Sequence, residues 1–125
     1  MISNGAIIGV VDDEASVRRS LDRLLRAYGF RVQTFASADE FLEHPAAAET
    51  PACLIVDLRM PGKTGLDLVD ALRARGTEIP VIMITGHGEV SMAERAGKAA
   101  LEFLAKPVDG DLLLQAIARA LERPG

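Results

Sequence analysis

Five side chains that can do chemistry stand where apolar runs of the chain end: Asp12, Asp13, Asp57, Thr85 and Lys106. Two carboxylates ~4 Å apart repel by about 4 kcal/mol at an effective dielectric constant near 20, so a crowded set needs a cation or a proton. Oxygen ligands of this kind suit Mg²⁺. If the fold gathers these residues, they can hold a phosphoryl group. Asp57 would then be the nucleophile that forms an acyl phosphate.

Each of these residues also has an ordinary explanation, which the residues alone leave open. Asp57 can simply begin a turn. Asp12 and Asp13 can cap the following helix, a contribution of ~1 kcal/mol or less, although one acid would serve that purpose. Thr85 can reflect strand propensity, and Lys106 can be a solvated strand end.

Apolar runs and amphipathic segments alternate along the chain and predict the elements that position these residues. Apolar runs at 6–11, 52–57 and 80–85 are typical of buried strands, and residues 101–105 predict a fifth strand. The alternating segment 31–35 predicts a strand near an edge. Five helical patterns follow these strands. The first ends at Gly29 and has an apolar stripe of Val17, Leu21, Leu24, Leu25 and Tyr28, and the second is short and begins with a capping box at Ser37 and Glu40. The third runs from Thr64 or Gly65 to Gly76, the fourth is a weak pattern over 89–99, and the fifth begins at Asp109 or Asp111.

Alternation of strand and helix predicts an α/β fold with a parallel sheet and helices on both faces. The most apolar strands, 6–11 and 52–57, are expected to be central neighbours in a doubly wound five-stranded sheet of order 2-1-3-4-5. Asp12, Asp13 and Asp57 would then meet at one end of that sheet, because neighbouring strands lie ~4.8 Å apart.

Composition predicts one globular domain over residues 1–125. The chain is 49% hydrophobic and 26% charged with a net charge of −4, which argues against a nucleic-acid-binding surface. Cys53 is the single cysteine, so no internal disulfide forms and a reducing compartment is expected. No apolar run is long enough for a membrane span, and we expect a soluble cytoplasmic protein. His44 has no ligand-type neighbour and is expected at a solvated helix end.

Four motifs, taken in order, resemble the receiver domain of a two-component response regulator: Val11-Asp12-Asp13-Glu14, Asp57-Leu58-Arg59-Met60-Pro61-Gly62, Thr85-Gly86-His87-Gly88 and Lys106-Pro107. The third motif, with Glu89-Val90 after it, is similar to the FixJ-like branch, whose receivers precede a helix-turn-helix (LuxR-type) output domain. The resemblance covers essentially the whole chain and implies the flavodoxin-like, CheY-like form of the fold.

The resemblance also implies the roles of the site residues. Asp57 would accept a phosphoryl group from a histidine kinase. Asp12, Asp13 and Asp57 would bind Mg²⁺ together with the backbone carbonyl of Arg59, and Lys106 would bind the phosphoryl group. The domain would be a phosphoryl acceptor, with self-catalysed phosphorylation and dephosphorylation, and not an enzyme.

A switch is implied as well. Thr85 would move toward the phosphoryl group and Phe103 would swing inward, although Phe103 also suits a plain core position. The face of the fourth helix, fifth strand and fifth helix would then change shape and support docking or a homodimer. The Lys106–Pro107 bond would be cis.

One region departs from the family pattern. Lys98-Ala99-Ala100-Leu101 lacks a residue and a glycine that FixJ-like receivers usually have there, and Gly97 weakens a helix interior by ~1 kcal/mol relative to Ala. We expect the helix over 89–99 to be short, frayed or shifted, which puts the usual dimer mode in doubt.

Other functions remain open at this point. A stand-alone receiver would act by protein–protein contact alone, without a DNA-binding output domain after Gly125. An aspartyl-phosphate phosphatase would want a second acid where Arg59 stands, and a flavodoxin-like nucleotide binder would want a phosphate-binding loop where the acids Asp12 and Asp13 stand.

Overall fold

A computed structural model describes residues 5–44, 49–86 and 102–122. Strands and helices alternate as the sequence predicts, and the helix expected over 89–99 lies outside the described residues. The elements are, in chain order, β1 (Ile7–Val11), α1 (Ala15–Ala27), β2 (Arg31–Phe35), α2 (Ala38–Leu42), β3 (Cys53–Asp57), α3 (Gly65–Ala74), β4 (Val81–Thr85), β5 (Glu102–Ala105) and α5 (Gly110–Glu122).

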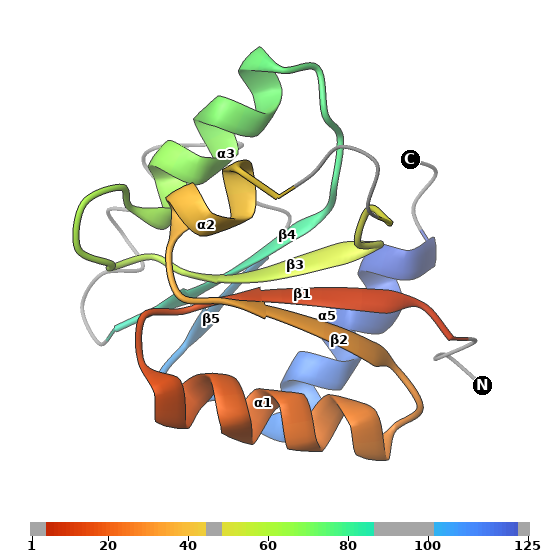
Figure 1. Cartoon of the computed structure of the whole chain (residues 1–125). Helices are drawn as coiled ribbons and strands as arrows, with labels where there is room; N and C mark the ends of the chain where they lie inside the picture. Colours follow the sequence, from red (N-terminus) through yellow and green to blue (C-terminus); the bar gives the residue numbers. More distant parts are fainter. Residues whose placement is uncertain (1–4, 45–48, 87–101, 123–125) are drawn as a thin grey trace.

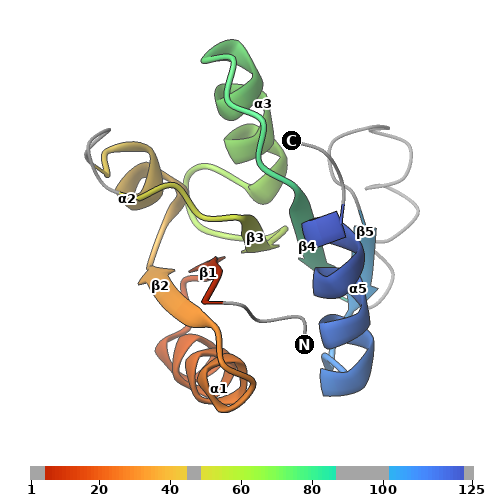
Figure 2. The same ribbon diagram turned by 90° about the vertical axis from the view of Figure 1, so that its right-hand side faces the viewer.

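The five strands form one sheet, with every neighbouring pair parallel, in the order β2-β1-β3-β4-β5. Helices α1 and α5 cover one face and α2 and α3 the other (Figures 1 and 2). This is the doubly wound order expected from the sequence. The alternating strand β2 is an edge strand, as predicted.

Each face of the sheet carries its own apolar cluster. On the side of α1 and α5, Ile55 packs with residues such as Leu25 and Leu113. On the side of α2 and α3, Leu54 packs with residues such as Leu68 and Met83. All residues of β1, β3 and β4 are buried, which explains why their sequences are continuous apolar runs.

The helix ends follow capping chemistry. Gly29 has a φ of +91° and allows the chain to turn after α1. Thr64 and Asp67 form a full capping box at the start of α3, and Ser37 Oγ accepts a bond from the Glu40 amide at α2. Asp109, rather than Asp111, caps α5, because its Oδ1 accepts bonds from the amides of residues 111 and 112.

Two expectations about side chains are wrong. Tyr28 is 49% exposed, because α1 ends at Ala27 and the apolar stripe stops at Leu25 before reaching it. His44 is half-buried, since its ring packs edge-on against Phe35 with the ring centroids 5.2 Å apart. Within the described part of the chain, no helix is long and apolar enough to cross a membrane.

Candidate functional site

Strand register brings the functional residues to one edge of the sheet. Val11 of β1 pairs with Val56 of β3, so the next residues along the two strands, Asp12 and Asp57, leave the sheet as neighbours. Thr85 ends β4 and pairs with the last residue of β5, directly before Lys106. Parallel strands end at the same edge, so all these side chains reach one rim.

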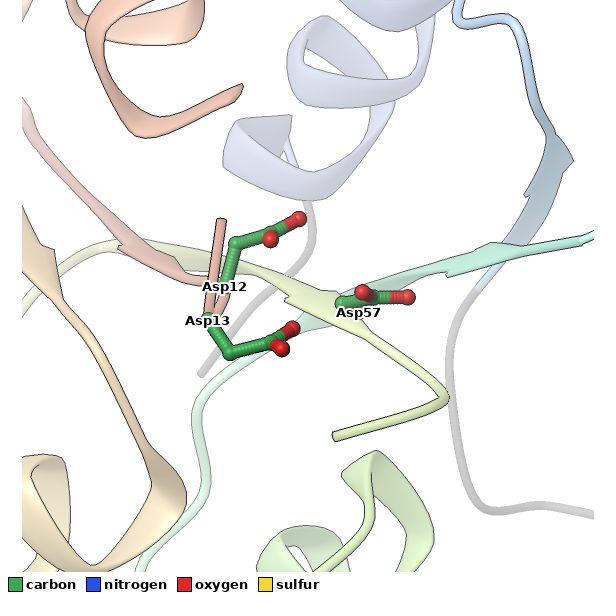
Figure 3. A group of neighbouring side chains, drawn as sticks. All are labelled: Asp12, Asp13 and Asp57. Atoms are coloured by element: carbon green, nitrogen blue, oxygen red, sulfur yellow. The ribbon is translucent and has the colours of Figure 1, made fainter. Parts of the chain in front are cut away.

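Three carboxylates converge at this rim. One ligand oxygen from each of Asp12, Asp13 and Asp57 lies within 4.8 Å of the others. Figure 3 shows the three carboxylates directed toward a shared space beside the end of β3. Asp12 is 2% exposed and Asp57 is 3% exposed, whereas Asp13 faces solvent. A small cation bound here would therefore contact the two buried carboxylates of Asp12 and Asp57 and the solvent-exposed carboxylate of Asp13.

Backbone amides hold two of these carboxylates in place. Asp12 Oδ1 accepts a 2.8 Å hydrogen bond from the Glu14 amide, and Asp57 Oδ1 accepts a 3.4 Å bond from the Arg59 amide. The Arg18 guanidinium donates to the Asp12 carbonyl at 2.7 Å, which fixes the chain between β1 and α1.

Lys106 supplies positive charge at the same rim. Its Nζ lies 3.3 Å from Asp57 Oδ2 and 3.9 Å from Glu14 Oε1. Its backbone amide donates to the Thr85 carbonyl at 2.8 Å, and the Lys106–Pro107 bond is cis, as predicted. The ammonium therefore reaches across the end of β4 to the central strand β3.

The pKa values show that the rim disfavours the charged form of its two inner carboxylates. Burial raises the pKa of Asp57, and the Asp13 charge adds to this, while Lys106 opposes it. Burial likewise raises the pKa of Asp12, with Asp57 adding to the effect. Burial lowers the pKa of Lys106, but Asp57, Asp12 and Glu14 outweigh it and raise the pKa overall. Crowded hard oxygen donors of this kind fit a divalent cation.

The two expected switch residues lie near the rim in different ways. Thr85 is fully buried at the end of β4, and its hydroxyl donates to the Leu104 carbonyl at 3.5 Å, which is a weak bond. Phe103 is half-buried one strand further out and packs against the cluster under α2 and α3. Thr85 thus ends the strand that lies between Asp57 and Lys106, and Phe103 lies on the next strand, β5.

Sequence reasoning missed two features of the site. Glu14 belongs to the first of the four sequence motifs, but no role was predicted for it. Its contact with Lys106 is between residues far apart in the sequence, so no local pattern predicts it. Gly65 was expected only as a helix start, yet a Cβ there would lie 2.5 Å from Met83 Sδ and 2.8 Å from the Asp57 carbonyl oxygen. The absence of a side chain at Gly65 lets α3 pack against the end of β3.

Comparison with known proteins agrees with this geometry. Residues 8–118 match the model of the response regulator receiver domain family. Nodulation protein W of Bradyrhizobium diazoefficiens is 43% identical over 122 residues, which cover 97% of this chain and 53% of that protein. The transcriptional regulatory protein FixJ of Azorhizobium caulinodans is 40% identical over 117 residues, which cover 93% of this chain and 55% of FixJ. The crystal structure of FixJ-N has a TM-score of 0.86 at 40% identity and covers 96% of each chain.

These relatives confirm the FixJ-like resemblance that the Thr85–Gly88 motif predicted. The chain spans only 53% to 55% of the length of the two regulators. Receiver domains are phosphoacceptors of two-component systems rather than enzymes in the usual sense. The chain belongs to the response regulator receiver domain family.

Proposed function

We propose that Asp57 is the phosphorylation site of this receiver domain and takes its phosphoryl group from a histidine kinase. The observation that carries the proposal is the placement of the Asp57 carboxylate, which is 3% exposed at the end of β3, grouped with two other acids and 3.3 Å from an ammonium. No other arrangement in the described residues joins a buried carboxylate to both a ligand set and a lysine.

The chemistry follows from the residues present. An Asp57 oxygen attacks phosphorus, the P–N bond to the kinase histidine breaks, and the histidine nitrogen keeps the electron pair. Asp12, Asp13, Asp57 and the Arg59 carbonyl would hold Mg²⁺, which supplies positive charge to the phosphoryl oxygens when bound. Lys106 contacts a phosphoryl oxygen, and its ammonium needs to move only from Asp57 to the group attached there.

Small donors can replace the kinase in the same reaction. With acetyl phosphate, the P–O bond to the acetyl group breaks and acetate leaves with the electron pair. Hydrolysis of the acyl phosphate by water returns Asp57 to its carboxylate and closes the cycle.

The switch that we propose uses Thr85 and Phe103. The weak bond of the Thr85 hydroxyl leaves it available to a new acceptor, and a phosphoryl group offers strong acceptor oxygens. Movement of Thr85 would open space behind it for Phe103, which packs half-buried nearby. The surface of β5 and α5, with the segment before β5, would then change and support a homodimer or another docking event.

The output that we propose is control of transcription. It rests on the similar regulators, of which FixJ is named as a transcriptional regulatory protein and is nearly twice as long as the matched segment. A DNA-binding domain outside residues 1–125 would carry the output, and the receiver would bind no nucleic acid itself. Its exchange with the kinase would take place in the cytoplasm.

Phosphorylation by acetyl phosphate in the presence of Mg²⁺ tests the proposal. Intact-mass measurement should show one phosphoryl group on the wild type, none on Asp57→Asn, and none after chelation of the metal. Asp70→Asn is the matched control, because Asp70 is exposed on α3, and it should be labelled like the wild type. Labelling of Asp57→Asn at the wild-type rate would contradict the assignment.

A further inference from the structure

Glu14 stands at a turn where its backbone is fixed and its side chain is left available. It is the N-cap residue of α1, yet its side chain makes no capping hydrogen bond. Its amide donates to Asp12 Oδ1, and its carbonyl accepts from the Arg18 amide at 3.1 Å. The side chain is 58% exposed, and the one group that its carboxylate pairs with among the described residues is Lys106, at the rim.

Lys106 is thereby shared between two carboxylates. Its Nζ lies 3.3 Å from Asp57 Oδ2, within hydrogen-bond reach, and 3.9 Å from Glu14 Oε1, which is ion-pair distance only. An ammonium on a flexible four-carbon stem can shift between such partners, unlike the rigid fork of a guanidinium. The position of the charge therefore depends on both acids.

We propose that Glu14 is a positioning residue that holds the Lys106 ammonium partly away from Asp57 and so slows phosphoryl uptake. The inference rests on the proposed function of Asp57. Phosphoryl oxygens of a donor need Lys106 as a partner, and Glu14 competes with them for it. Glu14 would thus limit the spontaneous reaction with small donors.

The test compares rate constants for phosphorylation by acetyl phosphate with Mg²⁺, measured by intact mass on the 125-residue chain. Glu14→Gln should react about two- to fivefold faster than the wild type, the range expected for loss of a partly exposed ion pair. Glu78→Gln removes the same charge from an exposed loop at the opposite end of the sheet, before β4, and should react at the wild-type rate.

Glu14→Asp separates position from charge. A shorter acid at an N-cap accepts bonds from the first-turn amides, so its carboxylate turns to α1 and leaves Lys106. This variant keeps the charge, should unfold at a higher temperature than the wild type, and should still react about as fast as Glu14→Gln. If Glu14 acted only through stability, the two variants would differ in rate as they differ in stability. The same increase in rate in both variants would therefore exclude a merely structural role.

Three results overturn the inference. Wild-type rates in both Glu14 variants do so, and so does a faster Glu14→Gln beside an unchanged Glu14→Asp, which would mean that charge alone acts. Both results leave the proposed function intact. Lack of uptake by the wild type itself would instead remove the proposed function and this inference with it.

Discussion

The interior of the central strands and their carboxyl ends differ sharply in chemistry. Among the described residues, the buried polar side chains are Asp12, Asp57 and Thr85, and each stands at the end of a strand. One or two residues earlier, the same strands carry only apolar side chains, with Ile55 1% exposed and Met83 fully buried.

This difference separates stability from chemistry along a single strand. Apolar burial in the interior contributes about 25 cal/mol for each Å² removed from water. At the rim, burial works against the charged form and raises the pKa of both Asp12 and Asp57. The interior therefore stabilises the fold, whereas the rim holds two carboxylates whose charged form is disfavoured by burial.

The largest effect is expected from the interior. Ile55→Ala should lower the free energy of unfolding by about 2–5 kcal/mol, because it leaves a cavity among packed side chains. Leu112→Ala is the control, since Leu112 is 51% exposed, and it should change stability by less than about 0.5 kcal/mol. Urea unfolding measures both, and equal losses would contradict the two-cluster core.

A smaller loss is expected where the interior meets the rim. Gly65→Ala should cost about 1–3 kcal/mol, because the new methyl group would press on the rigid Asp57 carbonyl as well as on Met83. Gly110→Ala is a matched control: its nearest new contact would be a Leu24 methyl group at 3.6 Å, an ordinary distance. In thermal unfolding, Gly65→Ala should lower the unfolding temperature clearly, whereas Gly110→Ala should raise it or lower it much less.

A modest gain is expected at the rim itself. Asp57→Asn should raise stability by about 1 kcal/mol at pH 7 without metal, because it removes a buried charge among like charges. The raised pKa of Asp57 means that the folded state holds its proton more tightly than the unfolded chain. The wild type therefore loses stability as the pH rises through that raised pKa, and the advantage of Asn shrinks on acidification.

Unfolding curves from pH 4 to pH 8 measure this gain, with Asp70→Asn as a control that should show none. Mg²⁺ should stabilise the wild type and reduce the difference in the free energy of unfolding between the wild type and Asp57→Asn. A variant less stable than the wild type at every pH would show that the ion pair with Lys106 outweighs desolvation.

The smallest effect is expected for the reaction of Cys53 with thiol reagents, because Cys53 is a fully buried residue of β3. Burial raises the pKa of its thiol to about 12, so almost no thiolate forms near pH 8. A thiol reagent should leave Cys53 unmodified in the folded protein and label it in denaturant. A cysteine introduced by Ala27→Cys, at the exposed end of α1, should react in the folded protein and confirm that the reagent is active.

The sequence predicted the sheet well because its three inner strands, β1, β3 and β4, are buried on both faces. A strand such as β3 reads as an unbroken apolar run, and the carboxylate that ends it marks the rim. The order of strands then places Asp12 beside Asp57 without further information. The capping residues could also be predicted, because a cap bonds to backbone groups only a few positions away in the chain.

Long-range contacts could not be read in this way. The side chain of Glu14 reaches Lys106 only because β1 and β5 end at the same rim, and local pattern cannot predict that distance. His44 looked like a solvated helix end, but Phe35 from a separate strand covers its ring. Tyr28 fits the helical period, yet the helix ends just before it.

The contact between Lys106 and Asp57 has a mechanical consequence. It passes over the end of β4 and joins the central strand β3 to the junction of β5 and α5. A change in the charge of Asp57 is therefore expected to act on Lys106 directly, because the two side chains are 3.3 Å apart. Lys106 is therefore a direct side-chain contact between the centre of the sheet and the end of its edge strand, in addition to the strand pairing that joins them.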